Sequence, residues 1–460
     1  MNRREFLKQA GMGAVALSVS SVLPSGLQAA EAVGTTGRKP NIIFILSDDV
    51  GLGNIGCCGA DHFKTPRLDA LAKSGTRFEQ CFSTPLCGPS RSQCLTGRYP
   101  FRTGMISNQS GSVMDPANEI MMPKMLKSAG YVTAQVGKWN QLPLQPGDWG
   151  FDEYLRFAGS GKYWREQDPN YILNGTPTDL PGGKYLPDVM HEFLVDFMTR
   201  HKDQPFYVHY AMSHIHGPIL RTPDSTSTSD KYVDNITYMD KLVGKLMEEL
   251  DRLKLRDKTL IIFVGDNGTA PGPADNATVH GKRLSGQKGT MLEGGSRVPM
   301  IVSWPGTTPA GKVSQDLIDF SDYFPTFAAL AGAKLPADRT IDGHDFSPQV
   351  RGKKGKPREW VYVELTGRWY ARSRNWKLTR SGELFDMKEA PFVEKPVPAD
   401  TTDPEAIAAR KSLQAVLDKL NPAAGKQAEI QPKPKQKSKQ RKQQQQGNPP
   451  VPAATPGAGT

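Results

Sequence analysis

The nine residues NIIFILSDD, at positions 41–49, decide the fold class of this chain. The first seven form an apolar run rich in β-branched residues, which predicts a strand buried on both faces of a sheet. The pattern recurs as TLIIFVGDN at positions 259–267. Strand-like and helical segments alternate around these two runs, as expected of a mostly parallel sheet covered by helices. We therefore predict an α/β fold.

Each run ends in a pair of side chains that carry oxygen atoms, Asp48-Asp49 and Asp266-Asn267. Adjacent carboxylates repel each other unless a cation lies between them, and ligands of open α/β sheets bind at the carboxyl ends of the strands. One such pair alone would be weak support for a metal, because acidic residues often cap loops. Since the pattern occurs twice and brings no Cys or His cluster, we predict a site for one hard cation, Ca²⁺ or Mg²⁺ rather than Zn²⁺.

A third stretch, CGPSRSQCLTGR at positions 87–98, joins a nucleophile-type residue to a predicted helix start. Gly88 and Pro89 force a tight turn, and proline suits the first position of a helix. Ser90 and Arg91 then fall in the first helical turn, where free N–H groups and the helix dipole stabilise an anion. A lone cysteine is most often a core residue, so the prediction of a catalytic turn depends on the whole stretch.

This stretch resembles the signature of the type I sulfatases, Cys-x-Pro-Ser-Arg followed by Leu-Thr-Gly-Arg, and the resemblance runs from about Asn41 to about Met387. It implies the alkaline-phosphatase-like fold, with a large mostly parallel sheet sandwiched by helices. A smaller C-terminal α+β subdomain with a short antiparallel sheet is also implied. Cys87 is implied to be oxidised to Cα-formylglycine (3-oxoalanine) by a formylglycine-generating, or sulfatase-maturating, enzyme. The hydrated aldehyde is then the nucleophile.

The resemblance also implies roles for single residues. The family's cation ligands, usually for calcium, match Asp48, Asp49, Asp266 and Asn267. The other matched positions are Arg91 beside the formylglycine, Lys138 and Lys288 on the sulfate, and His216 near the leaving oxygen. The implied reaction hydrolyses a small-molecule or carbohydrate sulfate ester, including an aryl sulfate, to an alcohol and inorganic sulfate. Such an ester is anionic and gains charge on its bridging oxygen, so it needs preorganised positive charge and a proton donor.

One position departs from the family pattern. The family usually has His after Gly-Lys-Trp, where this chain has Asn140. That histidine is commonly placed to hydrogen-bond the formylglycine hydroxyl and to help the sulfated intermediate collapse, whereas asparagine cannot take a proton at neutral pH. We expect either that another base substitutes, with His214 as a candidate, or that the enzyme is slow.

Two other functions stay open at this point. Some relatives with the same cysteine motif hydrolyse phosphoesters or phosphonate monoesters, although the sequence has no His-rich cluster that would build a second metal site. A sulfated-glycan-binding protein, catalytically impaired by Asn140, is the other alternative, and the complete Cys87 motif argues against it. The substrate is not identified, but Trp149, Trp164 and Trp369 are candidates for stacking on sugar or aryl rings.

The two ends of the chain differ in composition from its middle. Residues 1–32 resemble a twin-arginine signal, with Arg3-Arg4 before an apolar run too short and too small for a membrane span. We therefore expect transport by the twin-arginine translocase, a periplasmic or secreted location, and no stable membrane insertion. Much of the net charge of +11 lies in the Lys- and Gln-rich segment 421–460. That segment is predicted to be disordered, and no nucleic-acid partner is expected.

Between these ends we predict a catalytic domain at 38–338 and a C-terminal subdomain at 339–420. The subdomain is expected to hold short antiparallel strands from Val361 onward, packed with a helix. The segment from Gly147 to about Gly183 is rich in Gly, Pro and aromatic residues, and we expect surface loops that shape a substrate pocket. The cysteines do not suggest a disulfide framework, although a single disulfide between two of Cys57, Cys58, Cys81 and Cys94 is an open alternative.

Overall fold

The computed structural model describes residues 39–426 except 111–112, 158, 160 and 165–170. The predicted signal at 1–32 and residues 427–460 of the predicted tail lie outside the described residues. The prediction of disorder was wrong for the start of that tail, because residues 422–424 form a 3-10 turn and the Lys426 N–H donates to the Phe101 carbonyl at 2.7 Å. Among the described helices, none has both the length and the apolar character that a membrane span requires.

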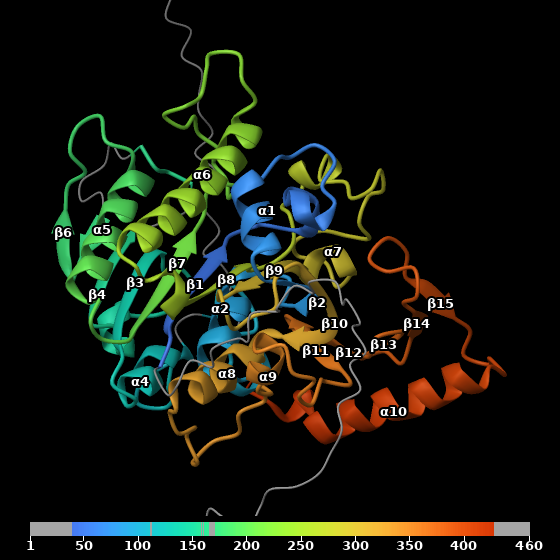
Figure 1. The fold of residues 1–460 in the computed structure, drawn as a ribbon. Helices are drawn as coiled ribbons and strands as arrows, with labels where there is room; N and C mark the ends of the chain where they lie inside the picture. The colour runs from blue at the N-terminus through green and yellow to red at the C-terminus, as the bar shows by residue number, and fades with distance from the viewer. Residues whose placement is uncertain (1–38, 111–112, 158, 160, 165–170, 427–460) are drawn as a thin grey trace, which may run out of the picture. The chain divides into compact units, whose positions relative to one another are not determined.

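The main sheet has ten strands, with β1 near its middle (Figure 1). In sheet order the strands are β10 (Lys312–Asp319), β2 (Thr76–Phe82), β9 (Arg297–Ser303), β8 (Thr259–Gly265), β1 (Asn41–Ser47), β7 (Phe206–Met212), β3 (Val132–Lys138), β4 (Glu153–Phe157), β5 (Tyr171–Leu173) and β6 (Thr176–Thr178). The five strands from β8 to β4 are parallel, β9 is antiparallel to both of its neighbours, and β5 and β6 form an antiparallel edge. The predicted mostly parallel α/β sheet is therefore confirmed.

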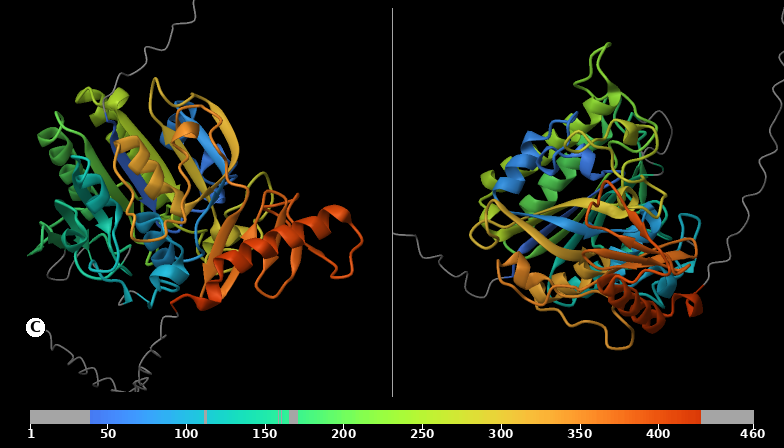
Figure 2. Two further views of the ribbon diagram at one scale, coloured as in Figure 1. Left: turned by 90° about the horizontal axis from the view of Figure 1, so that it is seen from below. Right: turned by 90° about the vertical axis from the view of Figure 1, so that its right-hand side faces the viewer.

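Helices cover both faces of this sheet (Figure 2). Consecutive side chains of a strand point to opposite faces. In β1, Ile43 and Ile45 therefore pack with α1, α5 and α6, whereas Ile42, Phe44 and Leu46 pack with α2, α4 and α8. The helices are α1 (Pro66–Lys73), α2 (Cys87–Thr96), α3 (Pro100–Thr103), α4 (Met122–Lys127), α5 (Leu186–Arg200), α6 (Lys231–Arg252), α7 (Glu293–Ser296), α8 (Tyr323–Ala331) and α9 (Ser347–Val350).

The C-terminal part of the chain forms a second sheet, which is antiparallel as predicted and has five strands. Its strands are β11 (Val361–Leu365), β12 (Arg368–Arg372), β13 (Trp376–Thr379), β14 (Leu384–Asp386) and β15 (Lys395–Val397). The helix α10 (Pro404–Leu420) packs on it, with Leu413 and Leu417 in the core that it shares with Tyr362 and Leu378. The boundary between residues 338 and 339 stays a prediction.

Three expectations are corrected. The segment predicted as surface loops, from Gly147 to about Gly183, contains β4 and the edge strands β5 and β6, because the sheet extends into it. Trp149 and Trp369 are core residues, 1% and 7% exposed, so neither can stack on a ligand, and Trp164 is half-buried with its ring against Tyr185. All five cysteines are free, so no disulfide forms among them.

Candidate active site

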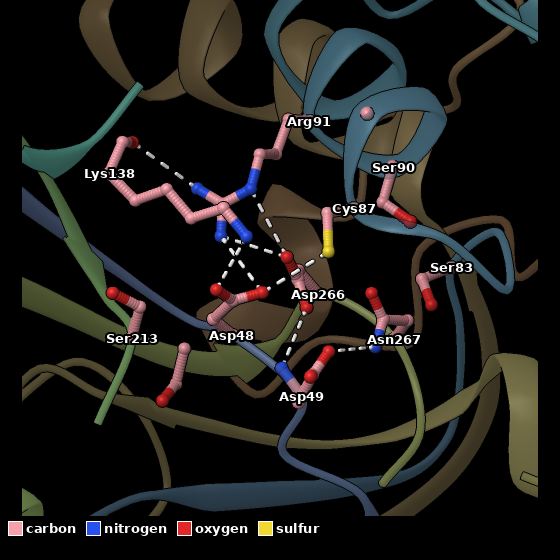
Figure 3. Close-up of polar contacts among 12 residues, drawn as sticks. Asp48, Asp49, Ser83, Cys87, Ser90, Arg91, Lys138, Ser213, Asp266 and Asn267 are labelled. Atoms are coloured by element: carbon pink, nitrogen blue, oxygen red, sulfur yellow. Dashed lines mark hydrogen bonds and ion pairs between the residues drawn. The ribbon is translucent and has the colours of Figure 1, made fainter. Parts of the chain in front are cut away.

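The two neighbouring strands β1 and β8 bring the predicted oxygen ligands together. They are parallel and in register, with Ser47 opposite Gly265, so the residues that follow them emerge side by side. The Asp49 N–H donates to Oδ1 of Asp266 at 3.1 Å, and Nδ2 of Asn267 donates to Oδ1 of Asp49 at 2.8 Å. With Asp48, these side chains converge at the carboxyl edge of the sheet (Figure 3). Each of the four is at most 1% exposed.

The donor atoms in this cluster fit a hard cation. The side-chain amide oxygen of Asn267, Oδ1, is buried and has no hydrogen-bond partner among the described residues. Ligand atoms of Asp48, Asp49, Cys87 and His216 lie within 4.8 Å of one another. An unpaired buried oxygen and three buried carboxylates are the donors that Ca²⁺ or Mg²⁺ prefers.

Cys87 is the first residue of α2 and points into the same cluster (Figure 3). Its turn is fixed by Ser90, whose N–H donates to the Leu86 carbonyl at 3.2 Å and whose Oγ donates to the Thr84 carbonyl at 2.9 Å. Sγ of Cys87 lies 3.2 Å from Oδ1 of Asp48. Burial, and then the nearby carboxylates of Asp266 and Asp48, raise the pKa of the thiol well above its usual value. An unmodified thiol here therefore stays neutral and is a poor nucleophile.

Three cationic side chains reach the carboxylates from three elements. Arg91, from α2, places Nε 3.1 Å and Nη2 2.8 Å from Oδ2 of Asp266. Lys138, the last residue of β3, places Nζ 2.5 Å from Oδ2 of Asp48. Lys288 comes from the loop after β8 and forms an ion pair with Asp49. The structure thus brings together the predicted cations and the predicted oxygen ligands.

The carboxylates respond in opposite ways to this environment. Burial by itself would raise the pKa of Asp48, but Lys138 first, and then His216, Arg91 and Lys288, hold that pKa well below its usual range. Burial and the neighbouring Asp48 raise the pKa of Asp266 to about 6. Of these two carboxylates, Asp48, which lies next to Cys87, is therefore the one held more firmly in its ionised form.

His216 follows β7 and is half-exposed at the edge of the cluster. Its Nδ1 lies 2.9 Å from the Gly217 carbonyl. Because a carbonyl can only accept, Nδ1 carries the proton of the neutral ring, and Nε2 is left to exchange a proton with a ligand. The geometry therefore suits His216 to proton transfer at the mouth of the site.

Asn140 stands where the family usually has histidine, and His214 is the candidate for a replacement base; the two lie in different surroundings. Asn140 is half-buried on the segment after β3, which packs against the start of α2, since a Cβ on Gly88 would lie 3.1 Å from Cβ of Gln141. His214 is buried with its ring centroid 5.0 Å from that of Tyr163, and burial lowers its pKa to about 3. His214 is therefore placed among tyrosines as a neutral core residue, and the hypothesis that it replaces the missing base loses its support.

Sequence reasoning missed the side chains that hold the ligand loops. Oδ1 of Asn54 accepts from the Gly51 N–H at 2.9 Å and from Oγ1 of Thr269 at 2.7 Å, and so ties the loop after Asp49 to the loop after Asn267. No local signal marks such a contact, because Asn54 and Thr269 are 215 positions apart. The tie becomes visible only once the strands are paired.

Comparison with known proteins identifies the class. A model of the sulfatase family matches residues 40–333, and a model of the C-terminal part of N-sulphoglucosamine sulphohydrolase matches residues 285–391. This chain belongs to the sulfatase family, and it is a sulfuric ester hydrolase of the alkaline-phosphatase-like superfamily. The family and the activity predicted from the sequence are therefore confirmed.

Several relatives are similar over most of their length. N-acetylgalactosamine-6-sulfatase of Canis lupus familiaris is 34% identical over 360 residues, which are 70% of this chain and 68% of that one. Arylsulfatase A of Homo sapiens is 32% identical over 383 residues, 74% of this chain and 73% of the relative. The crystal structure of Ps i-CgsB in complex with k-i-k-neocarrahexaose has a TM-score of 0.72 at 28% identity, covering 85% of this chain and 94% of its own.

Proposed function

We propose that this sulfatase hydrolyses a sulfate ester of a carbohydrate, with a formylglycine at position 87 and one bound Ca²⁺, or Mg²⁺ in its place. The observation that carries the proposal is the state of Cys87. Its thiol is buried, 3.2 Å from Asp48, and has a raised pKa, so the side chain as encoded is unsuited to attack. Two relatives support a carbohydrate substrate, one by its name, N-acetylgalactosamine-6-sulfatase, and one by its complex with k-i-k-neocarrahexaose.

The formylglycine and the cation would contribute to the reaction in different ways. A hydrated aldehyde at position 87 would supply a hydroxyl nucleophile for sulfur, and a divalent cation would polarise the sulfate oxygens. Asp48, Asp49, Asp266 and Asn267 would hold the cation. Lys138 and Lys288, which are fully and mostly buried, supply fixed positive charge for the remaining sulfate oxygens. Arg91 keeps the carboxylates of Asp266 and Asp48 in place beneath the reacting atoms.

Proton transfer to the leaving alcohol is assigned to His216. Its Nδ1–H stays bonded to the Gly217 carbonyl, so the ring must carry a second proton, on Nε2, and that proton passes to the departing oxygen as the ring becomes neutral. Asn140 is expected to hydrogen-bond the side chain at position 87 without taking its proton. The release of sulfate from the enzyme is then expected to be the slower half of the reaction.

The same proposal includes the route of the protein. We infer that a formylglycine-generating enzyme modifies Cys87 in the cytoplasm and that the twin-arginine translocase then exports the folded chain to the periplasm or beyond. The residues that resemble the export signal, Arg3-Arg4 and the apolar run after them, support this inference. Export is tested by comparing where the wild-type protein and the double variant Arg3→Lys with Arg4→Lys are found. The wild-type protein is expected outside the cytoplasm and the double variant inside it.

The decisive measurement is the mass of the tryptic peptide that spans residues 78–91, from protein expressed in its native host. An aldehyde in place of the Cys87 thiol, with hydrolysis of sulfated oligosaccharides that Cys87→Ala abolishes, is the expected result. An intact thiol in folded protein would refute the formylglycine mechanism. Binding of sulfated glycans without turnover would then favour the impaired homologue, for which Asn140 is the supporting observation. Faster hydrolysis of phosphonate monoesters than of sulfate esters would favour the other alternative.

A further inference from the structure

The turn that carries Lys288 is placed by backbone contacts with two other segments. The Lys288 N–H donates to the Thr269 carbonyl at 3.0 Å, and the Gly289 N–H donates to the Pro85 carbonyl at 2.9 Å. The first bond ties the turn to the loop that follows the cation ligands of β8. The second ties it to the segment before α2. Lys288 therefore depends for its position on elements around the turn rather than on a strand of its own.

The short helix α7 packs so closely on this turn that two of its positions require glycine. A Cβ on Gly294 would lie 2.2 Å from the carbonyl oxygen of Gly286, and one on Gly295 would lie 2.2 Å from the carbonyl oxygen of Thr290. The Gly268 N–H also donates to the Gly295 carbonyl at 3.0 Å. Because there is no free space between them, a displacement of α7 displaces the turn.

The first residue of α7, Glu293, is held by the C-terminal sheet. Arg372 of β12 places Nε 2.7 Å from Oε1 of Glu293 and Nη2 3.2 Å from Oε2. Both side chains are at most 1% exposed. Burial alone would raise the pKa of Glu293, but Arg372 and Arg297 hold it below its usual range, so the carboxylate is ionised. A two-point guanidinium–carboxylate contact fixes orientation as well as distance.

A second buried cation, Lys377 of β13, reaches the same segment. Its Nζ donates to the Met291 carbonyl at 3.2 Å and forms an ion pair with Glu394. The other carboxylate oxygen of Glu394 accepts from the Glu293 N–H at 2.7 Å. The family model that matches residues 285–391 begins just before the Lys288 turn and includes α7, β12 and β13. The turn and the two strands thus lie within one matched unit.

We propose that Arg372 and Lys377 are positioning residues for the sulfatase reaction, which place Lys288 beside Asp49 by holding α7 through Glu293. This inference rests on the proposed function and deepens its account of the same site. Buried ion pairs contribute little stability that apolar side chains of similar volume would not also provide. The directional contacts of these pairs explain why charged groups occupy these positions.

The test is a double-mutant cycle of Arg372→Met with Lys288→Ala, assayed on an aryl sulfate. If Arg372 acts through Lys288, Arg372→Met lowers kcat/KM by about 10- to 100-fold in the wild-type background and has almost no further effect in Lys288→Ala. Arg372→Lys keeps the charge and is expected to restore part of the activity. Arg358→Met is the matched control, because Arg358 and Asp322 form an equally buried pair that does not contact α7. Its effect is expected to be the same in both backgrounds.

Amide hydrogen exchange gives a second readout that does not require activity. The peptide that spans residues 285–296 is expected to exchange faster in Arg372→Met, and in Arg372→Lys to a smaller extent, but not in Arg358→Met. Equal factors in both kinetic backgrounds, or unchanged exchange of this peptide, would overturn the inference. Failure of the wild-type enzyme to hydrolyse sulfate esters would refute the proposed function instead, and the exchange experiment would still decide the role of Arg372.

Discussion

Replacing Lys138 by methionine is expected to lower both the stability and the activity of the protein. Nζ of Lys138 lies 2.5 Å from Oδ2 of Asp48, and both side chains are fully buried. Methionine fills similar space but leaves Asp48 without its nearest cation. The next one, Nη2 of Arg91, is 3.8 Å from the other carboxylate oxygen and is already shared with Asp266.

The loss can be estimated from this burial. Removing one partner of a buried ion pair costs about 3–5 kcal/mol. For a folded unit of roughly 400 residues, an unfolding entropy of about 2 cal/mol/K per residue converts that cost into a fall in Tm of about 4–6 °C. Lys127→Met is the matched control, because Lys127 pairs with Asp152 at 2.6 Å but the two side chains are 43% and 29% exposed. An exposed pair contributes about 0–1 kcal/mol, so its Tm should fall by at most about 1 °C.

The stability difference should also depend on pH. The pKa of Asp48 is depressed in the folded protein, so its ionised form contributes stability that is present above its unfolded pKa and is lost as the pH falls toward the folded one. The difference in unfolding free energy between wild type and Lys138→Met should therefore have its full size at pH 7 and should decrease below about pH 4. Calorimetry in the presence of a chelator measures this difference as a change in Tm. In the same variant, kcat/KM should fall by about 10²- to 10³-fold. A Tm at pH 7 equal to that of wild type would refute the reasoning.

Three further predictions concern the cation, a buried acid and the missing histidine. Adding Ca²⁺ at about 100 times its Kd to chelator-treated protein should raise Tm by about 3 °C, and Asn267→Ala should reduce this rise; a Tm that ignores Ca²⁺ would contradict the cation site. Burial raises the pKa of Glu364 to about 7, so the folded state binds more protons than the unfolded state between about pH 4.5 and 7, and stability falls as the pH rises through that window. Relative to wild type, Glu364→Gln should therefore gain up to about 3 kcal/mol between pH 4.5 and pH 8 in denaturant titrations, and an equal difference at both pH values would show that Glu364 ionises normally. Asn140→His should raise kcat in the hydrolysis of an aryl sulfate, whereas a lower turnover would show that asparagine is not an impairment at this position.

The central strands and the catalytic turn could be predicted because their signals are local. The bounds of β1 and β8 follow from uninterrupted apolar runs. The glycine and proline after Cys87 predicted a helix there, but α2 starts at Cys87, so Pro89 is its third residue and not its first as expected. The strand β2, with the sequence TRFEQCF, and β10, with exposed residues at its start, lack that signal because they pair at one edge of the sheet. Their strand character depends on partners more than 200 residues away along the chain.

The contacts of the candidate site show the same division. Parallel strands end at one edge of the sheet, so the positions of Asp48, Asp49, Asp266 and Asn267 along the chain were enough to predict that these side chains lie together. The basic residues around them were expected only from the resemblance to the sulfatases. The contacts that hold these side chains were not predictable, since the carboxylate of Glu293, in α7, meets Arg372 of the second sheet across 79 positions of the chain. His214 and His216 illustrate the limit, because two histidines two residues apart face a tyrosine cluster and the active site respectively.

The balance of charge in the pocket gives a physical reason for a cation beside so many basic groups. The buried carboxylates of Asp48, Asp49 and Asp266 are matched by Arg91, Lys138 and Lys288, so the side chains alone carry almost no net charge. A neutral, buried pocket offers little compensation for the desolvation of an anionic ester. A divalent cation on the carboxylates would leave about two positive charges in excess, which one ester sulfate would only partly neutralise. Cation binding and sulfate binding should therefore be coupled, with inorganic sulfate binding more weakly to chelator-treated protein than to the Ca²⁺-loaded form.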